Sequence, residues 1–274
     1  MLEKIVRIGQ PIPINGILSE PDKSIASSAC VIILNSGLMH HTGTCRFSVK
    51  LARELAKNGV ASLRFDFPGR GDSAAIRDRV DSQATSVEEI QLIMNQLEQQ
   101  NNYNRFILYG LCSGAYDSYH TALVDKRVAG IAQIDPYVYR TPSWYWHHYL
   151  SRFFGWAQWL DILKDKIPWI NAIPNKHDIS EKVSLSVATP PKEKVVHGYN
   201  QLIAAGTQIL IVITNGTSYA LNRKNQLFKM YTAVNWRNQM DYIYLPDCSH
   251  IITEPEYQQK IKTIISDWIV KTLT

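Results

Sequence analysis

The sequence predicts an α/β fold in which a mostly parallel sheet is covered by helices on both faces. Short apolar runs alternate with segments of helical length along the 274 residues. The runs are rich in β-branched and aromatic residues, as buried parallel strands are. Each intervening segment is long enough to cross back over a sheet. With 45% hydrophobic residues, the chain can bury one substantial core.

Six apolar runs are the predicted strands of the central sheet, at residues 30–35, 60–65, 105–110, 128–134, 208–214 and 241–246. The opening residues 3–19 alternate more weakly and contain two prolines and the turn dipeptide Asn15-Gly16. This pattern is typical of an antiparallel hairpin at a sheet edge. We therefore expect about eight strands in all.

Six helices are predicted around these strands, at residues 45–58, 82–100, 113–124, 192–205, 221–233 and 255–271. The alternation of strand-like and helix-like segments stops at residues 137–191, where aromatic and basic residues are dense and no strand pattern occurs. We interpret residues 137–191 as a helical cap inserted over the carboxyl edge of the sheet, where open α/β sheets bind ligands. Residues 1–136 and 192–274 would then form the core of a single domain.

The composition favours a cytoplasmic protein that binds neither nucleic acid nor membrane. The four cysteines lack the paired spacing of a metal site, and the first residues lack the apolar core of a secretion signal. No apolar stretch approaches the roughly 20 residues that span a bilayer. The net charge of +5 is scattered along the chain rather than gathered in a basic run. We expect neither a metal nor a cofactor.

The segment YGLCSGAY, residues 109–116, predicts a nucleophile at Cys112. Gly110 and Gly114 lie two residues before and two residues after it, between an apolar run and a predicted helix. A sharp turn from strand to helix leaves room only for small residues at those two positions. The start of the helix then stabilises a thiolate. An inert buried cysteine is the alternative, and Ser113 is a rival nucleophile that lacks a glycine two residues before it.

A cysteine nucleophile needs a base, and the base needs an acid that orients it. His250 lies on a loop after the last predicted strand, whereas the other histidines lie earlier or in the predicted cap. The turn at residues 214–222 has no carboxylate. We therefore expect the acid to be Asp135, at the end of the strand after the elbow helix, because neighbouring strand ends lie about 5 Å apart. Asp247 and the absence of any acid are the alternatives.

An oxyanion hole requires two backbone N–H donors aimed at the developing charge. We expect Ser113, directly after the nucleophile, to supply one of them. The other is expected from Gly37 or Leu38, in the loop after the run at residues 30–35. Gly37 permits the close approach or the unusual dihedral angle that such a loop requires.

Residues around this centre are candidates for substrate contacts. His41 and Arg46 are expected at the mouth of the site, although a polar loop at a helix start is an equally good interpretation. From the predicted cap, aromatic side chains are expected to form the roof of an apolar pocket. Tyr137, Trp144 and Tyr145 are the contacts that we predict there.

The stretch NSGLMHHTGTCRFSVKLARELAKNGVASLRFDFPGRGDS, residues 35–73, resembles the oxyanion loop, first helix and FDxxGxGxS turn of the α/β-hydrolase superfamily. Together with the Cys112 elbow and the late His250, the resemblance covers essentially the whole chain. Within the superfamily, the chain is similar to bacterial hydrolases of exopolysaccharide and polyketide pathways, including the exosortase-associated type. The resemblance implies an α/β-hydrolase fold, and dienelactone hydrolases of that superfamily also use cysteine, which allows a Cys-His-Asp triad.

These observations together predict an acyl-ester or thioester hydrolase, or an acyl transferase. A thiolate is expelled readily from a tetrahedral intermediate, which favours activated acyl groups over amides. The expected substrate is a small molecule with a medium-sized, largely apolar acyl group, for which CoA or an acyl carrier protein is a candidate carrier. Two alternatives remain open. One is a lyase of the same fold that eliminates a carboxylate such as acetate from a tetronate, and the other is a catalytically silent binding module.

Overall fold

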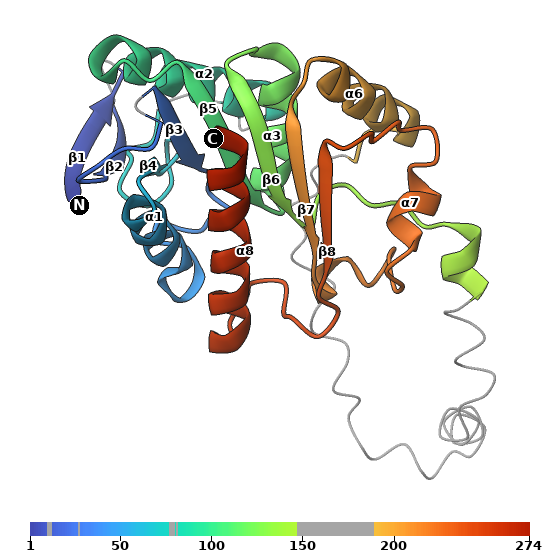
Figure 1. Ribbon diagram of the computed structural model, residues 1–274. Coiled ribbons are helices and arrows are strands. Elements are labelled where there is room, and N and C mark those ends of the chain that lie inside the picture. The colour runs from blue at the N-terminus through green and yellow to red at the C-terminus, as the bar shows by residue number, and fades with distance from the viewer. Residues whose placement is uncertain (10–12, 27, 77–79, 81, 147–188) are drawn as a thin grey trace.

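The protein is built around one eight-stranded sheet with the strand order β1-β2-β4-β3-β5-β6-β7-β8 (Figure 1). The structure is a computed structural model, and it describes residues 1–9, 13–26, 28–76, 80, 82–146 and 189–274. All pairs from β4 to β8 are parallel, whereas β1 and β2 form an antiparallel hairpin at one edge. The predicted α/β fold with about eight strands is confirmed.

The six strands β3 to β8 begin and end within two residues of the predicted runs, and β1 and β2 form the hairpin predicted over residues 3–19. They are β1 (Leu2–Ile8), β2 (Ile14–Glu20), β3 (Ala29–Ile33), β4 (Ala61–Phe65), β5 (Arg105–Leu111), β6 (Val128–Ile134), β7 (Gln208–Ile213) and β8 (Met240–Tyr244). Every residue of β3 and β4 is buried, as expected for parallel strands covered on both faces.

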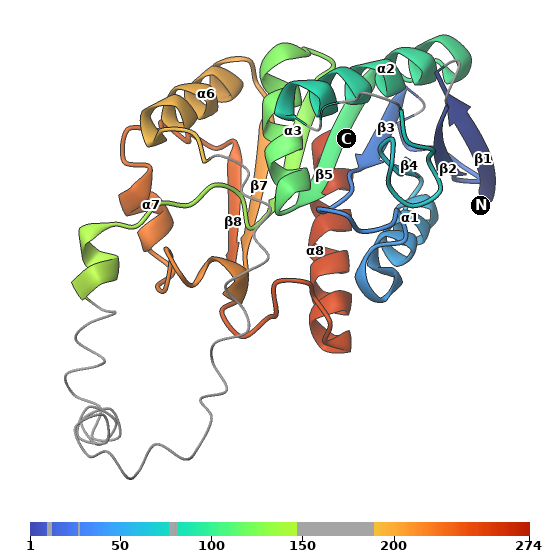
Figure 2. The ribbon, with the colours of Figure 1, turned by 180° about the vertical axis from the view of Figure 1, so that it is seen from behind.

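Helices cover both faces of this sheet. On one face lie α1 (Phe47–Lys57) and α8 (Pro255–Leu273), as Figure 1 shows, and they contact each other. The opposite face carries α2 (Gln83–Asn101), α3 (Ser113–Val124) and α6 (Lys192–Ala204), as Figure 2 shows. Among the helices in the described ranges, none combines the length and the apolar content needed to cross a membrane.

The alternation of side chains along each strand divides the core into two layers. In β5, Phe106 and Leu108 join the core beneath α2, α3 and α6, whereas Ile107 and Tyr109 join the core beneath α1 and α8. Both layers are fully buried at the strand that carries the elbow. The base of the predicted nucleophile is therefore held from both sides.

One predicted helix is wrong in its extent. The segment 221–233 was expected to be a single helix, but only α7 (Gln226–Met230) is α-helical there. The buried side chain of Gln226 accepts hydrogen bonds from the N–H groups of Asn222 and Arg223, at 2.7 Å and 3.1 Å. The Gln226 side chain therefore caps the turn in front of α7, and the helix begins only at Gln226.

Of the predicted cap at residues 137–191, the structure describes residues 137–146 and 189–191, and residues 142–146 are helical. The remainder of that prediction lies outside the described residues. The described part packs on the core through Trp144, whose indole N–H donates to the carbonyl oxygen of Ser218 at 3.1 Å.

Candidate active site

Cys112 lies at the tip of a strained turn between β5 and α3. Its φ of 54° and ψ of −114° are outside the usual range of a residue with a side chain. A Cβ atom added to Gly110 would lie 2.1 Å from the carbonyl carbon of Gly114, and one added to Gly114 would lie 2.7 Å from the carbonyl oxygen of Asn35. The two glycines are therefore required by close backbone contacts. The thiol is half-buried and free.

The imidazole of His250 contacts the carboxylate of Asp135. The ring Nδ1 lies 2.6 Å from Asp135 Oδ2, across 115 residues of sequence. Asp135 follows β6 directly and has a φ of 51°, a conformation that aspartate tolerates better than most residues. Asp247 is exposed, and the carboxylate bonded to His250 is that of Asp135.

Thr214, directly after β7, also holds this carboxylate. Its backbone N–H donates to Asp135 Oδ1 at 2.7 Å, and its hydroxyl donates to Asp135 Oδ2 at 2.5 Å. The same hydroxyl oxygen accepts a hydrogen bond from the N–H of Gly216 at 3.2 Å. The acid is thus fully engaged and almost completely buried, which fixes the direction in which it faces His250.

Gly216 belongs to the short turn η2 (Asn215–Thr217), which occupies the place where the sequence has no carboxylate. A Cβ atom at this position would lie 2.1 Å from His250 Nδ1 and 2.7 Å from Asp135 Oδ2. The turn is tied to the loop of His250, because Asn215 N–H donates to the carbonyl oxygen of Cys248 at 2.9 Å. Gly216 therefore leaves the room in which the acid reaches the histidine from the neighbouring strand.

The pKa of His250 is raised from 6.5 to about 10. The hydrogen bond with Asp135 is the largest cause, and the hydrogen bond with Cys112 is the second, while burial acts in the opposite direction. Both partners stabilise the charged form of the imidazole. The protonated ring is therefore favoured when it lies between the thiol and the carboxylate.

The predicted oxyanion loop is held against the start of α3. The N–H of Gly37 donates to the hydroxyl oxygen of Ser113 at 2.7 Å. Gly37 has a φ of +55°, and an added Cβ atom would meet nothing within 4 Å, so the dihedral angle rather than crowding calls for glycine. Leu38 follows with its side chain largely exposed. The N–H of Ser113 is at the first position of α3, where a helix supplies no acceptor of its own.

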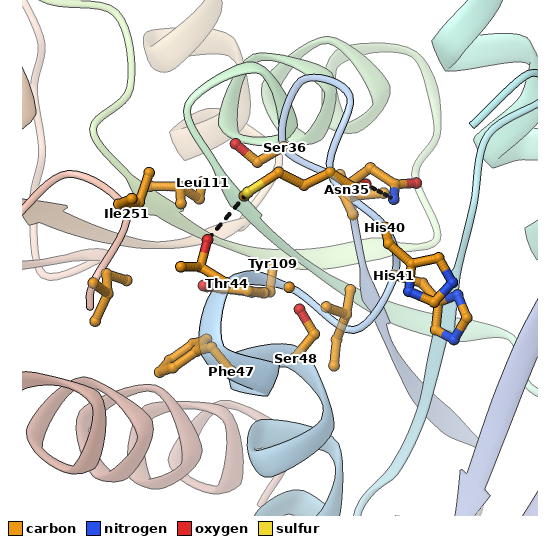
Figure 3. Close-up of a pocket in the computed structure, with 15 residues that line it drawn as sticks. Asn35, Ser36, His40, His41, Thr44, Phe47, Ser48, Tyr109, Leu111 and Ile251 are labelled. Atoms are coloured by element: carbon orange, nitrogen blue, oxygen red, sulfur yellow. Dashed lines mark hydrogen bonds between the residues drawn. The ribbon is translucent and has the colours of Figure 1, made fainter. Parts of the chain in front are cut away.

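A pocket lies beside this loop, between the end of β3, the start of α1 and the loop that carries His250 (Figure 3). Leu111 and Ile251, the neighbours of Cys112 and His250 in the sequence, contribute to its wall. Thr44 donates a hydrogen bond from its hydroxyl to the sulfur of Met39 across the pocket, at 3.1 Å.

His41 and Arg46 occupy different surroundings. His41 is buried in the wall of this pocket, and its Nδ1 lies 2.7 Å from Asp66 Oδ2. Arg46 is exposed at the position before α1 and has a left-handed φ of 62°. Its role at the mouth of the site stays a prediction.

The predicted aromatic contacts differ in their exposure. Tyr137 is buried and stacks on Tyr116, with ring centroids 4.0 Å apart and an angle of 3° between the rings. Trp144 is also buried, and Tyr145 packs edge-on against it with 44% of its surface exposed. Tyr137 and Trp144 are thus packed in the interior of the described part of the chain, and the substrate contacts of the three aromatic residues stay predictions.

Sequence reasoning missed two tyrosines whose pKa values depend on Cys112. Burial raises the pKa of Tyr116, and Cys112 is the second cause. Burial and then Cys112 also raise the pKa of Tyr219, in the segment after η2. The position of Tyr116 carried a usable signal, because residues four apart share one face of a helix. Tyr219 carried none, since its place depends on how the segment after β7 folds back.

Chemically, the arrangement offers a thiol on a strained turn, an imidazole oriented by a buried carboxylate, and backbone amides beside the thiol. The groups come from strand ends that share one edge of the sheet, after β3, β5, β6, β7 and β8. In chain order they run nucleophile, acid, histidine, which is the order of α/β hydrolases. Such a constellation supports nucleophilic acyl chemistry.

Solved structures of hydrolases share this fold. An esterase from Pyrococcus furiosus superposes with a TM-score of 0.62 at 14% identity, covering 100% of this chain and 92% of that chain. A proline iminopeptidase from Mycobacterium smegmatis has a TM-score of 0.62 at 12% identity, with 99% of each chain covered. An α/β serine hydrolase without a lid from Xanthomonas campestris has a TM-score of 0.59 at 13% identity, covering 98% of this chain and 94% of that chain.

No curated protein matches the chain. A family model described as serine aminopeptidase, S33, matches residues 26–213, which is more than half of the chain. The match includes the oxyanion loop, the elbow and Asp135. Together with the sheet order and the shared fold, it establishes that the chain belongs to the serine aminopeptidase S33 family and has the α/β-hydrolase fold.

Proposed function

We propose that the protein hydrolyses activated acyl esters or thioesters by nucleophilic catalysis, with Cys112 as nucleophile, His250 as acid and base, and Asp135 as the orienting acid. The observation that carries this proposal is the contact between His250 Nδ1 and Asp135 Oδ2 at 2.6 Å, beside a cysteine on a strained elbow. A strained nucleophile and an oriented base are what acyl transfer requires.

In the proposed first step, the thiolate of Cys112 attacks the carbonyl carbon and forms a C–S bond, while the carbonyl π electrons move to the oxygen. The N–H of Ser113 stabilises that oxyanion together with the N–H of Leu38, or with that of Gly37 once the Gly37 N–H exchanges its acceptor, the hydroxyl of Ser113, for the substrate oxygen. When the intermediate collapses, the bond to the leaving group breaks and the protonated His250 gives its Nε2 proton to the leaving oxygen or sulfur. The product is an acyl thioester on Cys112.

In the second step, neutral His250 takes a proton from water as the water oxygen attacks the acyl carbon. The intermediate then expels the Cys112 thiolate, releases the carboxylic acid and restores the thiolate–imidazolium pair. Asp135 accepts the hydrogen bond from His250 Nδ1 throughout, which keeps Nε2 directed at the reaction. If an alcohol or amine replaces water, the same intermediate gives acyl transfer.

The raised pKa of His250 favours a cysteine mechanism over a serine mechanism. An imidazole that is largely protonated at neutral pH is a poor base toward a hydroxyl but a good partner for a thiolate. A thiolate also leaves an intermediate more readily than an amine does, so we propose esters and thioesters rather than the peptides that the family description suggests. The carrier, CoA or an acyl carrier protein, and a role in a biosynthetic pathway are part of the proposal.

Alkylation of the cysteines tests the nucleophile. Iodoacetamide should modify Cys112 at pH 7 faster than Cys45, which is exposed and serves as the control within the same chain. Since a free thiol is only about 3% thiolate at that pH, the gain is limited to about 30-fold. His250→Ala should remove most of the difference. Equal rates for the two cysteines, measured by peptide mass spectrometry, would contradict the mechanism.

Intact mass spectrometry tests the reaction itself. After brief exposure to acyl-CoA thioesters or p-nitrophenyl esters, we expect one acyl group on the wild-type protein and none on Cys112→Ala. A lyase would convert an acylated substrate without forming this adduct, and a binding module would neither form it nor turn over. The similar solved structures are a hydrolase, an esterase and a peptidase, and none of them favours a lyase or a binding module.

A further inference from the structure

Two adjacent histidines and two aspartates converge beside the oxyanion loop, and the proposed reaction uses none of them. His40 and His41 lie on the loop after β3, and Asp66 and Asp72 lie on the loop after β4. One nitrogen or oxygen atom from each residue lies within 4.8 Å of the others. Figure 3 shows the two imidazole rings side by side, at the end of the pocket away from Ile251.

The separations between these atoms suit a tetrahedral metal ion. His40 Nε2 lies 3.4 Å from Asp66 Oδ2 and 3.2 Å from Asp72 Oδ2. His41 Nδ1 lies 2.7 Å and 3.9 Å from the same two oxygens. Ligands bound to Zn²⁺ at about 2.0–2.1 Å in a tetrahedron lie about 3.3–3.4 Å from one another. The four observed separations, from 2.7 Å to 3.9 Å, lie on both sides of this value. Small shifts of the side chains would therefore give the tetrahedral arrangement.

The surroundings orient the four groups toward a common point. Asp66 Oδ1 is held by the side-chain amide of Asn35 at 2.9 Å and by the backbone N–H of His41 at 2.6 Å, while Oδ2 faces the histidines and accepts the backbone N–H of Asp72 at 3.0 Å. His40 Nδ1 lies 3.1 Å from the hydroxyl of Thr42 and accepts a hydrogen bond from the Thr42 backbone N–H at 3.3 Å, so Nε2 is the nitrogen that faces the two carboxylates.

Gly71 keeps the space between the loops open. A Cβ atom there would lie 2.2 Å from Asp66 Oδ2 and 2.6 Å from the Cδ2 atom of His40. The cluster also holds two carboxylates, and the side chain of Asp66 has no exposed surface at all. One divalent cation would balance the charge of both carboxylates.

We propose that His40, His41, Asp66 and Asp72 form a four-ligand site for a divalent transition metal, best matched by Zn²⁺. Two imidazole nitrogens and two carboxylate oxygens form a donor set that this ion accepts in tetrahedral geometry. The bound ion joins the loop after β3, which carries the Gly37 amide, to the loop after β4. It acts as a structural brace, and its existence does not depend on the proposed acyl chemistry.

Zinc titration of the full chain tests the site, with the protein untagged and first treated with a chelator. We expect one equivalent of Zn²⁺ by calorimetry and elemental analysis, a rise in thermal midpoint, and the visible spectrum of four-coordinate cobalt when Co²⁺ replaces zinc. His40→Ala and Asp72→Asn should each weaken zinc binding at least about tenfold. Asp72 is largely exposed, so its variant keeps the fold even if His40→Ala does not.

Three control variants separate this site from other metal-binding groups. His197→Ala and Asp267→Asn change exposed residues of the same types elsewhere in the fold and should leave zinc affinity unchanged. Cys112→Ala removes the thiol beside His250 and should also leave it unchanged. The proposal is overturned if about 100 µM zinc does not bind, which would leave a hydrogen-bonded network only. It is equally overturned if binding survives Asp72→Asn but is lost in Cys112→Ala.

Discussion

The proposed acid, Asp135, is a single carboxylate that accepts hydrogen bonds from three donors. Asp135 accepts from His250 Nδ1 and from both the N–H and the hydroxyl of Thr214. Because this side chain is buried, each of its oxygens has a set partner, and rotation would leave a polar group without one. The direction of the imidazole is thus decided by one residue that lies after β6 rather than after β7.

Asp135→Asn should preserve the fold but disable the base. An amide keeps the size of the side chain, yet it presents either its oxygen or its NH₂ group to His250 and so favours the wrong tautomer. We expect kcat for a p-nitrophenyl ester to fall by about 10²–10⁴. The matched control is Asp247→Asn, in the loop of His250, which should keep near-normal activity. Similar losses in the two variants would show that Asp135 has no special role.

At the scale of elements, the site depends on how closely three turns approach one another. The elbow after β5 is bounded by glycines, η2 follows β7, and the loop of His250 is anchored by the side-chain amide of Gln258, which donates to the carbonyl oxygen of Ile252 at 2.8 Å. The closest of these approaches is that of Gly216 to His250. A single methyl group at that position tests whether the turns position the histidine.

Gly216→Ala should separate His250 from Asp135 while leaving β7 in place. The new Cβ atom would lie 2.1 Å from His250 Nδ1, so the ring has to move. A displacement of this size is expected to lower kcat/KM by about 100-fold. Gly206→Ala is the control, since its added Cβ atom meets nothing within 4 Å.

The control has its own cost, because Gly206 has a φ of +86°. We expect Gly206→Ala to lose about 1–2 kcal/mol of unfolding free energy with its activity retained. Urea unfolding and ester kinetics on both variants separate the two effects. Full activity in Gly216→Ala would contradict the positioning role of the turn.

For the whole molecule, the parallel sheet collects the site from residues that are far apart in the sequence. Gly37, Cys112, Asp135 and His250 reach one edge because the strands before them run in the same direction. Folding therefore creates the interaction between His250 and Asp135, and the unfolded chain does not have it. Any preference of that interaction for one protonation state appears as a dependence of stability on pH.

The sign of that dependence follows from the raised pKa of His250, which moves from 6.5 to about 10 on folding. The folded state binds the proton more tightly, so the stabilisation is complete below pH 6.5 and is lost as the pH rises toward 10. About a third of the imidazole is exposed, and solvent screening reduces the effect. We expect wild-type protein to lose about 1–2 kcal/mol more than His250→Gln between pH 6 and pH 10.

Urea unfolding of both proteins at several pH values measures this difference. The comparison with His250→Gln removes the titration of lysines and tyrosines, which the two proteins share. Parallel stability curves for the two proteins would show that the imidazole is not charged in the native state.

The sequence by itself determined the local parts of this protein. Strand ends were predicted to within two residues because alternating and apolar runs are local patterns, and the Cys112 elbow follows from the steric need for glycines on both sides of a sharp turn. His250 and Asp135 could be selected because parallel strands place their carboxyl ends together. The helix at residues 221–233 was overextended, since the role of the Gln226 side chain is not visible in hydrophobic periodicity.

The tertiary structure alone decided the contacts that depend on distances between loops. Thr214 donates a hydrogen bond to Asp135, and Gly216 leaves room for the ring of His250. Tyr116 stacks on Tyr137. The convergence of two histidines with Asp66 and Asp72 likewise joins loops from neighbouring strands. Hydrogen bonds act over about 3 Å, whereas sequence patterns locate a loop only to within several residues. Local sequence patterns thus predict where a strand lies, but the packing of the loops decides which side chains meet at the end of that strand.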